Sequence, residues 1–291
     1  MGFREEQALK SPYPVSIHGG HSGQFCGHAK NSLEEIVQVY IAQGYPWVGI
    51  TEHMPPVSED FVYPEERSAG LNAKALRTRF ADYMSACRRL QAQYAHAIRI
   101  YVGFETETCR GSLDFATSLI ATFAPDYIVG SVHHVKDIPF DMSKLDYDAA
   151  AAACGGVDGL YSAYFDDQYD MIQTLKPRVV GHLDIIRIHD SDYRRRLLKP
   201  LIWEKIVRNL KLIRQLELIL DFNLRPLSRG EAEPYLAAPI LSKAHELGIA
   251  VVPGDDSHGV KDIGKHMDHA IEILQITGLG TSWAKPVRDS L

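Results

Sequence analysis

Short apolar runs alternate along the chain with longer stretches in which apolar positions recur every three or four residues. The first pattern is typical of β-strands and the second of amphipathic helices. The predicted strands are Val15–His18, Trp47–Glu52, Ile98–Phe104, Tyr127–Val132, Arg178–Leu183, Leu216–Asp221 and Ile249–Pro253. The predicted helices are Asn31–Gly44, Lys74–Ala95, Ser112–Phe123, Gly159–Thr174, Ile202–Gln215, Ala237–Leu247 and Met267–Thr277.

This alternation of strands and helices predicts an α/β protein with parallel strands joined by crossover helices. Either an open doubly wound sheet or a closed barrel satisfies the pattern, and neither a GxGxxG fingerprint nor a P-loop is present. A length of 291 residues fits one large domain, because α/β barrels run to about 250 residues. We therefore predict a single domain over residues 1–291, in which residues 1–12 form a poorly ordered or peripheral segment.

Composition narrows the class of protein. The formal charge of −6 argues against a general nucleic-acid binder, which would show a basic stripe. Small anionic substrates remain compatible with it, because bound cations reverse a local field. The four cysteines form no CxxC pair, and no apolar stretch reads as a signal peptide or membrane span. We predict a reduced, cytoplasmic protein that contacts neither nucleic acid nor membrane.

The placement of histidines points to a site. Eight of the 13 histidines lie at or just after the carboxyl end of a predicted strand, where random scatter would put about one or two. They are His18, His21, His28, His53, His133, His134, His182 and His258. Carboxylates share these positions, namely Glu52, Glu105, Asp184, Asp255 and Asp256. In parallel α/β folds these strand ends converge on one crevice, beside which we place the long connections Met54–Asn72 and Lys136–Asp158.

Neutral imidazoles with a few carboxylates form a ligand set that suits zinc, iron or manganese. So many candidates are compatible with more than one ion, and a multinuclear site can activate phosphoryl transfer to water. A carboxylate that bridges two ions must lie between them, and we assign this role to Glu105. The pair Asp256 and His258 has the i, i+2 spacing that places both side chains on one face of an extended chain.

Several of these assignments have alternatives. His53 could cap its strand instead of binding metal. His133 and His134 are adjacent, so an extended strand sends them to opposite faces, and we prefer His133 for the site. In Gly181-His182-Leu183-Asp184 one side chain could ligate while the other orients it. Cys26 lies between His21 and His28 and could be a soft metal ligand, but we prefer the interpretation that it is a buried structural thiol.

Six segments, in this order, resemble the polymerase and histidinol phosphatase (PHP) superfamily, and most closely its monofunctional histidinol-phosphate phosphatases of the fungal branch. They are His21–Ala29, Thr51–Pro55, Gly103–Glu105, Gly130–Val135, Gly181–Asp184 and Asp255–Gly259. Each is weak alone, but six in order over residues 21–259 are specific. The resemblance implies a distorted (β/α)7 barrel that holds a trinuclear cluster of zinc, iron or manganese.

Carried over residue by residue, the resemblance implies three ligand sets. His18, His21, Glu105 and Asp256 correspond to the ligands of the first ion, and His28, His53 and His258 to those of the second. Glu105 would bridge to a third ion held by His133 and His182. Arg187 is a candidate phosphate clamp, because a guanidinium matches phosphate oxygens in bidentate fashion, and Arg225 is a weaker candidate.

The first motif departs from the family pattern. The family usually has His-x-His, whereas this chain reads His18-Gly19-Gly20-His21. A bulge at the two glycines would turn His18 back into the site, because glycine tolerates positive φ. The alternative is that His18 points away and the first ion has one ligand fewer.

The resemblance implies hydrolysis of L-histidinol phosphate, a small phosphate monoester, to L-histidinol and phosphate in histidine biosynthesis. Asp184 is a candidate proton donor to the leaving group, or a residue that orients a ligand. One rival is a PHP phosphoesterase for another substrate, such as a nucleotide. A second rival is a metal-binding module without catalytic activity, which would bind ions but release no phosphate.

Overall fold

Parallel strands form one curved sheet in this computed structural model, which describes residues 12–287. The strands of this sheet are β1 (Trp47–His53), β2 (Arg99–Glu105), β3 (Tyr127–Gly130), β6 (Val179–Val180), β7 (Ile219–Asn223) and β8 (Ala250–Gly254), in that spatial order. All neighbouring pairs are parallel. Their residues are almost entirely buried, as expected when helices cover the outer face of a parallel sheet.

The first predicted strand, Val15–His18, connects the two edges of this sheet. Ser16 bridges in parallel to Val48 of β1, and its carbonyl accepts a 2.7 Å hydrogen bond from the Gly49 N–H. On the other side, the Ile17 N–H donates to the carbonyl of Pro253 in β8 at 2.9 Å. The segment therefore occupies the place of a seventh strand, and the predicted (β/α)7 barrel is confirmed.

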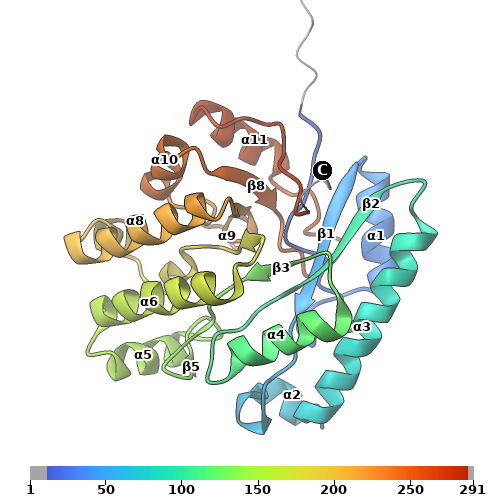
Figure 1. Cartoon of the computed structure of the whole chain (residues 1–291), viewed down its shortest axis with the longest axis horizontal. Helices are drawn as coiled ribbons and strands as arrows, with labels where there is room; N and C mark the ends of the chain where they lie inside the picture. The colour runs from blue at the N-terminus through green and yellow to red at the C-terminus, as the bar shows by residue number, and fades with distance from the viewer. Residues whose placement is uncertain (1–11, 288–291) are drawn as a thin grey trace, which may run out of the picture.

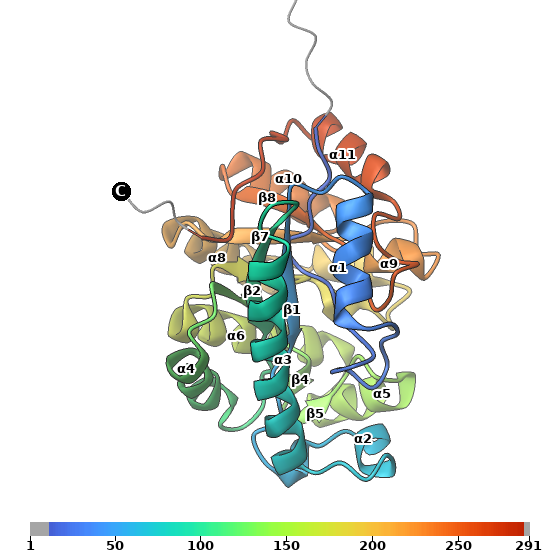
Figure 2. The ribbon, with the colours of Figure 1, turned by 90° about the vertical axis from the view of Figure 1, so that its right-hand side faces the viewer.

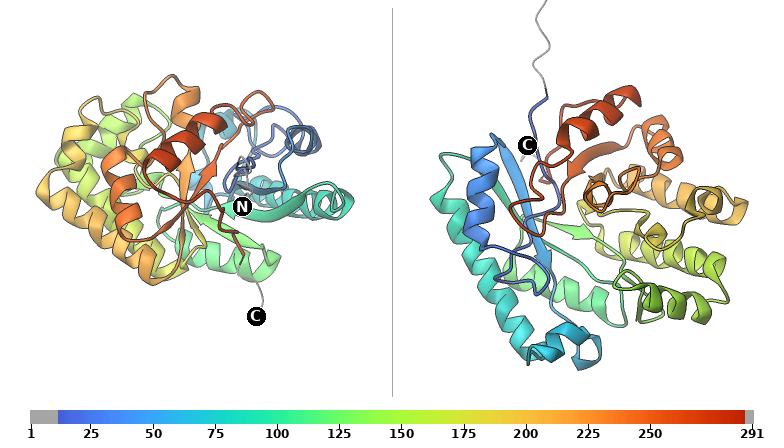
Figure 3. Two further views of the ribbon diagram at one scale, coloured as in Figure 1. Left: turned by 90° about the horizontal axis from the view of Figure 1, so that it is seen from above. Right: turned by 180° about the vertical axis from the view of Figure 1, so that it is seen from behind.

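Helices cover the outside of the sheet in two groups (Figure 1). They are α1 (Leu33–Ala42), α2 (Pro64–Ser68), α3 (Ala73–Gln93), α4 (Ser112–Phe123), α5 (Lys144–Ala153), α6 (Val157–Leu175), α7 (Tyr193–Leu197), α8 (Pro200–Gln215), α9 (Arg225–Ser228), α10 (Ala238–Glu246) and α11 (Met267–Ile276), with short 3-10 turns η1 (Glu59–Phe61) and η2 (Ile185–Arg187). Helices α1 and α3 lie side by side along β1 and β2 (Figure 2). Viewed from behind, the strands separate these two helices from α6 and α8 (Figure 3).

Helix α1 forms where its sequence predicts it. The Ser32 hydroxyl accepts from the Glu35 N–H, and the Glu35 carboxylate accepts from the Ser32 N–H at 2.7 Å, which completes the capping box. The apolar stripe of Leu33, Ile36 and Val37 is buried. The other predicted helices are also present, with ends that differ by at most two residues.

Several parts of the chain differ from the sequence prediction. Strand β7 begins three residues later than predicted, β3 ends two residues earlier, and the short helices α2, α7 and α9 were not predicted. The strand predicted over Arg178–Leu183 is reduced to Val179–Val180, because His182 has a positive φ of 20° that ends the extended conformation. The connection Lys136–Asp158 contains helix α5, begun by Ser143, and the hairpin of β4 (His134–Val135) with β5 (Ile138–Pro139) starts just before it.

One large hydrophobic core extends from Val15 to Trp283, with a small satellite of Val62, Ala73 and Leu76. The continuity of this core fits the predicted single domain. Residues 1–11 of the segment predicted to be peripheral lie outside the described range. Within residues 12–287, no helix combines the length and the apolar character that a membrane span requires.

Candidate metal centre

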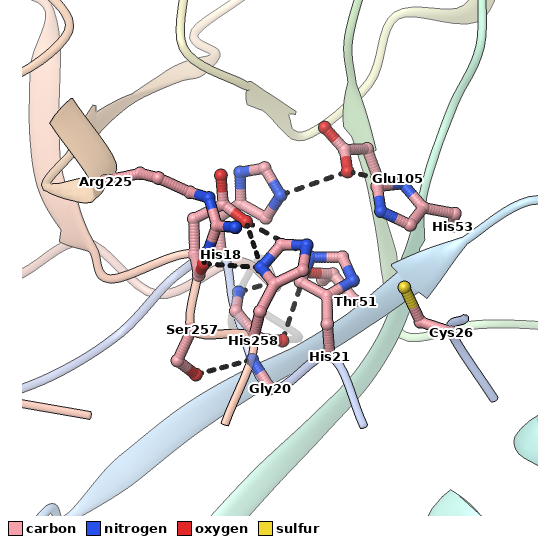
Figure 4. Close-up of polar contacts among 12 residues, drawn as sticks. His18, Gly20, His21, Cys26, Thr51, His53, Glu105, Arg225, Ser257 and His258 are labelled. Carbon is pink, nitrogen blue, oxygen red and sulfur yellow. Dashed lines mark hydrogen bonds and ion pairs between the residues drawn. The ribbon is translucent and has the colours of Figure 1, made fainter. Parts of the chain in front are cut away.

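Histidines and carboxylates from most of the strands meet in one pocket at the carboxyl end of the barrel. Figure 4 shows His18, His21, His53 and His258 grouped in one region, with Glu105 beside His53. His18, His21, Glu105 and His182 are almost fully buried, and His53 is partly exposed. His28 lies at the exposed rim. Residues from 18 to 258 thus converge on one place, as the parallel topology predicts.

Glu105, the last residue of β2, lies between imidazoles on both sides. Its Oε1 is 2.8 Å from His182 Nε2 and 3.3 Å from His133 Nε2. Its Oε2 is 3.0 Å from His53 Nδ1 and 3.4 Å from His18 Nε2. Two carboxylate oxygens that face two different pairs of nitrogens form the arrangement required of a bridging ligand.

His18 points toward Glu105 and the other donor atoms, so the alternative in which it points away from the site is wrong. Its Nδ1 lies 2.8 Å from Asp221 Oδ2, which leaves Nε2 directed at the cluster. Gly20 has a φ of 79°, so the chain turns at the glycine pair before His21. A carboxylate on the far nitrogen fixes the orientation and tautomer of a metal-binding imidazole.

Potential donor atoms within 4.8 Å of one another form four groups among the described residues. They are Cys26-His28-His53-His258, His18-Glu105-His182, His18-His21-Asp256 and His21-His53-Glu105. The second predicted ligand set is thereby brought together with Cys26 added. His18, His21 and Asp256 of the first set are also adjacent. Of the third set, Glu105 and His182 are grouped with His18, and His133 Nε2 lies 3.4 Å from His182 Nε2.

Unmet hydrogen-bonding capacity in this cluster fits the binding of cations. The buried atoms without a hydrogen-bond partner include His18 Nε2, both ring nitrogens of His21, His53 Nε2 and His182 Nδ1. Buried polar atoms in proteins normally form hydrogen bonds, so this concentration of atoms without a partner requires an explanation. Imidazole nitrogens and carboxylates that face one another are a donor set for zinc, iron or manganese, so the residues present fit such ions.

The neighbouring histidines keep two carboxylates of the cluster ionised. Burial by itself would raise the pKa of Glu105, but His18 and His133 outweigh it and hold that pKa well below its usual range. Burial would likewise raise the pKa of Asp256, and His18 and His21 reverse the shift. Burial, followed by the neighbouring His53, lowers the pKa of His21 to about 4. At neutral pH the carboxylates are therefore charged and His21 is neutral.

His134 lies on the same side of the pocket as His133, so the expected opposite orientation is wrong. His133 Nδ1 and His134 Nδ1 lie 3.1 and 3.2 Å from the same Glu107 oxygen. Strand β3 ends at Gly130, so alternation of side chains between faces does not extend to these two residues. His133 Nε2 still faces Glu105, as the preference for His133 requires.

The predicted role of Asp184 does not fit its contacts. Its two carboxylate oxygens accept hydrogen bonds from the backbone N–H groups of Leu236 and Ala237, at 2.7 and 2.9 Å. The side chain is fully buried, and the residue does not line the pocket. Asp184 therefore anchors the segment before α10 and is not placed to donate a proton to a substrate.

Arg187 also has a structural environment, which contradicts its predicted role as a phosphate clamp. Its Nη1 lies 2.9 Å from the Glu231 carboxylate, and its Nη2 donates to the carbonyls of Glu233 and Pro234 at 2.9 and 2.8 Å. The guanidinium also stacks over Tyr235 and lies outside the pocket lining. Its Nη1 and Nη2 donors are thus engaged with the protein, and its Nε lies 3.3 Å from Asp184 Oδ2.

Arg225, the weaker candidate in the sequence, lines the pocket together with Arg229. Its Nη1 donates to the backbone carbonyl of Asp256 at 2.9 Å, which holds the half-buried side chain beside a predicted metal ligand. The structure therefore reverses the order of the two arginines as candidates for a phosphate.

Three further polar residues of the site were not assigned a role from the sequence. Asp221 ends a buried apolar run, which is the signal that could have identified it. Glu107 follows Glu105 by two residues and shares its face of the chain. Asp141 lines the pocket from the long connection after β5, where no sequence signal distinguishes it, and burial raises its pKa.

Known proteins are similar to this chain in sequence and in fold. The model of the PHP domain family matches residues 19–225. A Schizosaccharomyces pombe protein named "Probable histidinol-phosphatase" is 35% identical over 270 residues, which cover 91% of this chain and 87% of that protein. The Saccharomyces cerevisiae histidinol-phosphatase is 28% identical, with 89% of each chain covered.

A solved structure shares the fold. The histidinol phosphate phosphatase of Lactococcus lactis, solved with zinc, L-histidinol and phosphate, superposes with a TM-score of 0.71 at 20% identity. The match covers 91% of this chain and 94% of that one. The family model and the S. pombe relative both extend over most of the sequence, and this protein belongs to the PHP domain family.

Proposed function

We propose that this protein is a metal-dependent histidinol-phosphatase, which hydrolyses L-histidinol phosphate to L-histidinol and phosphate in histidine biosynthesis. One observation carries the proposal: Glu105 lies between two pairs of imidazole nitrogens on the floor of an open pocket. The two fungal relatives named as histidinol-phosphatases support the choice of substrate, because each aligns with about nine-tenths of this chain.

The pocket would hold two to three ions of zinc, iron or manganese. The proposed ligand sets are His18, His21, Glu105 and Asp256; His28, His53 and His258; and Glu105, His133 and His182. When bound, such ions supply Lewis-acid activation of the phosphoryl group and of the water that attacks it. Asp221 and Glu107 keep the rings of His18 and His133 in place through their Nδ1 atoms.

Arg225 is the residue that we assign to the phosphate. It lines the pocket and is held by the Asp256 carbonyl, so its remaining donors are available to phosphoryl oxygens. A fixed, half-buried guanidinium loses little conformational entropy when it binds an oxyanion. Its position beside Asp256 would orient the phosphate toward the donor cluster.

A second part of the pocket lining, the acidic wall, suits a cationic leaving group. Glu107 and Asp141 line it together with the rings of Phe61 and Tyr63. Burial would raise the pKa of Glu107, but His133 and His134 outweigh it and keep this carboxylate ionised. Carboxylates and aromatic faces both attract the amine or imidazolium of histidinol, whereas a nucleotide offers no such cation. This wall favours histidinol phosphate over the nucleotide alternative.

The test is turnover by the purified full-length protein. We expect phosphate release from L-histidinol phosphate to exceed release from nucleoside monophosphates by about 100-fold or more in kcat/KM, because the acidic wall discriminates by a few kcal/mol. Removal of metal by a chelator should abolish turnover, and zinc or manganese should restore it.

Two outcomes would contradict the proposal. Faster release from a nucleotide would indicate a different PHP phosphoesterase. Metal bound at about two to three equivalents without any phosphate release would indicate the non-catalytic module. The predictions of a cytoplasmic location and of no nucleic-acid partner are separate, and they stay predictions.

A further inference from the structure

A cysteine completes one of the donor groups in the pocket. The donor atoms of Cys26, His28, His53 and His258 all lie within 4.8 Å of one another. Cys26 Sγ is 3.4 Å from His28 Nε2. A tetrahedral zinc ion with ordinary Zn–S and Zn–N bonds separates sulfur and nitrogen by about 3.6 Å. The sulfur is therefore spaced from the histidine as a ligand of the same ion would be.

The backbone around Cys26 directs the side chain to this place. The Cys26 N–H donates to the Ser22 carbonyl at 2.8 Å and closes a tight turn between His21 and His28. Figure 4 shows the sulfur pointing toward His53. Cys26 forms no disulfide, and its side chain is buried.

A second observation points to a ligand at the same position. His53 Nε2 is buried without a hydrogen-bond partner, while its Nδ1 faces Glu105 Oε2 at 3.0 Å. The His258 ring stacks on those of His21 and His28, with ring centroids 4.4 and 4.8 Å apart. The polar atom left unsatisfied in this group is thus His53 Nε2, and a cation would join it to the sulfur and the other imidazoles.

We propose that Cys26 is the fourth ligand of the ion held by His28, His53 and His258, and that it binds as a thiolate whose proton passes to solvent. The inference rests on the proposed metal-dependent function and deepens it. A thiolate adds one negative charge to three neutral imidazoles, and its softness favours zinc or cobalt over manganese at this position. The structure thus favours the alternative that the sequence alone ranked second.

Cobalt spectroscopy tests the proposal directly. In the full-length protein loaded with Co²⁺, we expect a sulfur-to-cobalt charge-transfer band in the near ultraviolet. The band should disappear in Cys26→Ser, while the visible cobalt bands remain and show that the ion is still bound. Cys109→Ser is the matched control, because Cys109 also lines the pocket but belongs to none of the donor groups, and it should keep the band.

A second measurement on the unchanged chain does not depend on whether the variant folds. Zinc should protect Cys26 from alkylation relative to the metal-free protein, as read by mass spectrometry, and should leave the labelling of Cys109 unchanged. The Cys26→Ser substitution should also weaken zinc retention by more than about 10-fold, because even partners outside the ligand set contribute that much.

The outcomes separate this proposal from the proposed function. A fully cobalt-loaded protein without the charge-transfer band, or a band that survives in Cys26→Ser, would overturn the role of Cys26. Either result could accompany full turnover of histidinol phosphate, which would leave the phosphatase proposal intact. Conversely, the band together with no phosphate release would retain the ligand and refute the phosphatase.

Discussion

His182 and Asp184 are two residues apart and equally buried, yet they belong to polar clusters of opposite character. Asp184 accepts hydrogen bonds from two backbone N–H groups and contacts Arg187. Arg187 in turn contacts one carboxylate and donates to two backbone carbonyls. His182 lies in a cluster of imidazoles in which its own Nδ1 and the His18 Nε2 have no hydrogen-bond partner.

This difference distinguishes a structural role from a binding role. A buried polar group whose hydrogen bonds are made within the protein stabilises the arrangement of loops around it. A buried group whose donors or acceptors are unmet is costly unless another species supplies the missing contacts. His182 and Asp184 are both almost fully buried, so hydrogen bonding, and not burial, distinguishes them.

The largest effect should come from the cluster with unmet donors. Glu105→Gln keeps the size of the side chain but removes the charge that two pairs of imidazoles share. We expect kcat/KM for histidinol phosphate to fall by about 10³-fold or more, because bridging charge stabilises the transition state by several kcal/mol. Phosphate release and metal content per chain measure this effect. Near-normal turnover with a full complement of metal would show that Glu105 is not the bridge.

A substitution in the cluster of Asp184 and Arg187 should change the stability of the protein and not its activity. Arg187→Met removes a guanidinium that is 3% exposed and leaves its acceptors unpaired. We expect the free energy of unfolding to fall by about 3 kcal/mol, as when one partner of a buried ion pair is lost. Urea denaturation of the metal-loaded protein measures it, and kcat/KM per folded molecule should stay within about 2-fold.

Arg225→Met is the matched control for Arg187→Met, because it also replaces an arginine, but one that lines the pocket. Its expected effects are the reverse: KM for histidinol phosphate rises by about 10-fold or more, and the free energy of unfolding changes by less than about 1 kcal/mol. If Arg187→Met raised KM while Arg225→Met destabilised the fold, the comparison of the two clusters would fail.

The smallest effect concerns Asp167 on α6, which belongs to neither cluster. Burial, together with Asp170 and Asp166, raises its pKa to about 6 from an ordinary value of 3.8. The folded protein therefore binds this proton more tightly than the unfolded chain, and the free energy of unfolding should decline as pH rises from about 4 to 6.

Asp167→Asn should remove that part of the decline and leave the variant about 1 kcal/mol more stable than the wild type at pH 7. Denaturant unfolding at pH 4 and pH 7 gives the comparison. An equal difference between variant and wild type at both pH values would refute the assignment, since the effect would then not involve titration.

Much of the barrel follows from local sequence. The apolar run of β1, the stripe of α1 and the capping box of Ser32 and Glu35 are properties of consecutive residues, and all are present in the structure. The convergence of His21, His53 and Glu105 could also be anticipated, because parallel strands place their carboxyl ends together. Helix α5 was not predicted, because it lies within the connection between β5 and α6 and does not alternate with a strand of the sheet.

The different environments of Arg187 and Arg225 could not be predicted from local sequence. Arg187 and Arg225 both follow strands at the same end of the barrel, and the sequence ranks Arg187 first. Which of them is available depends on Glu231, Glu233 and Pro234, which lie in a connection with no regular pattern. The orientation of His134 depends likewise on the point at which β3 ends.

The sequence by itself determined the order of strands and helices, the family and the group of residues from which the metal centre is drawn. These depend on periodicity and on short motifs, which are local. The tertiary structure decided which side chains have unmet donors, that Cys26 joins three histidines, and that Asp221 holds His18. Such properties depend on contacts between residues up to about 240 positions apart, and a hydrogen bond is made or lost within less than an ångström.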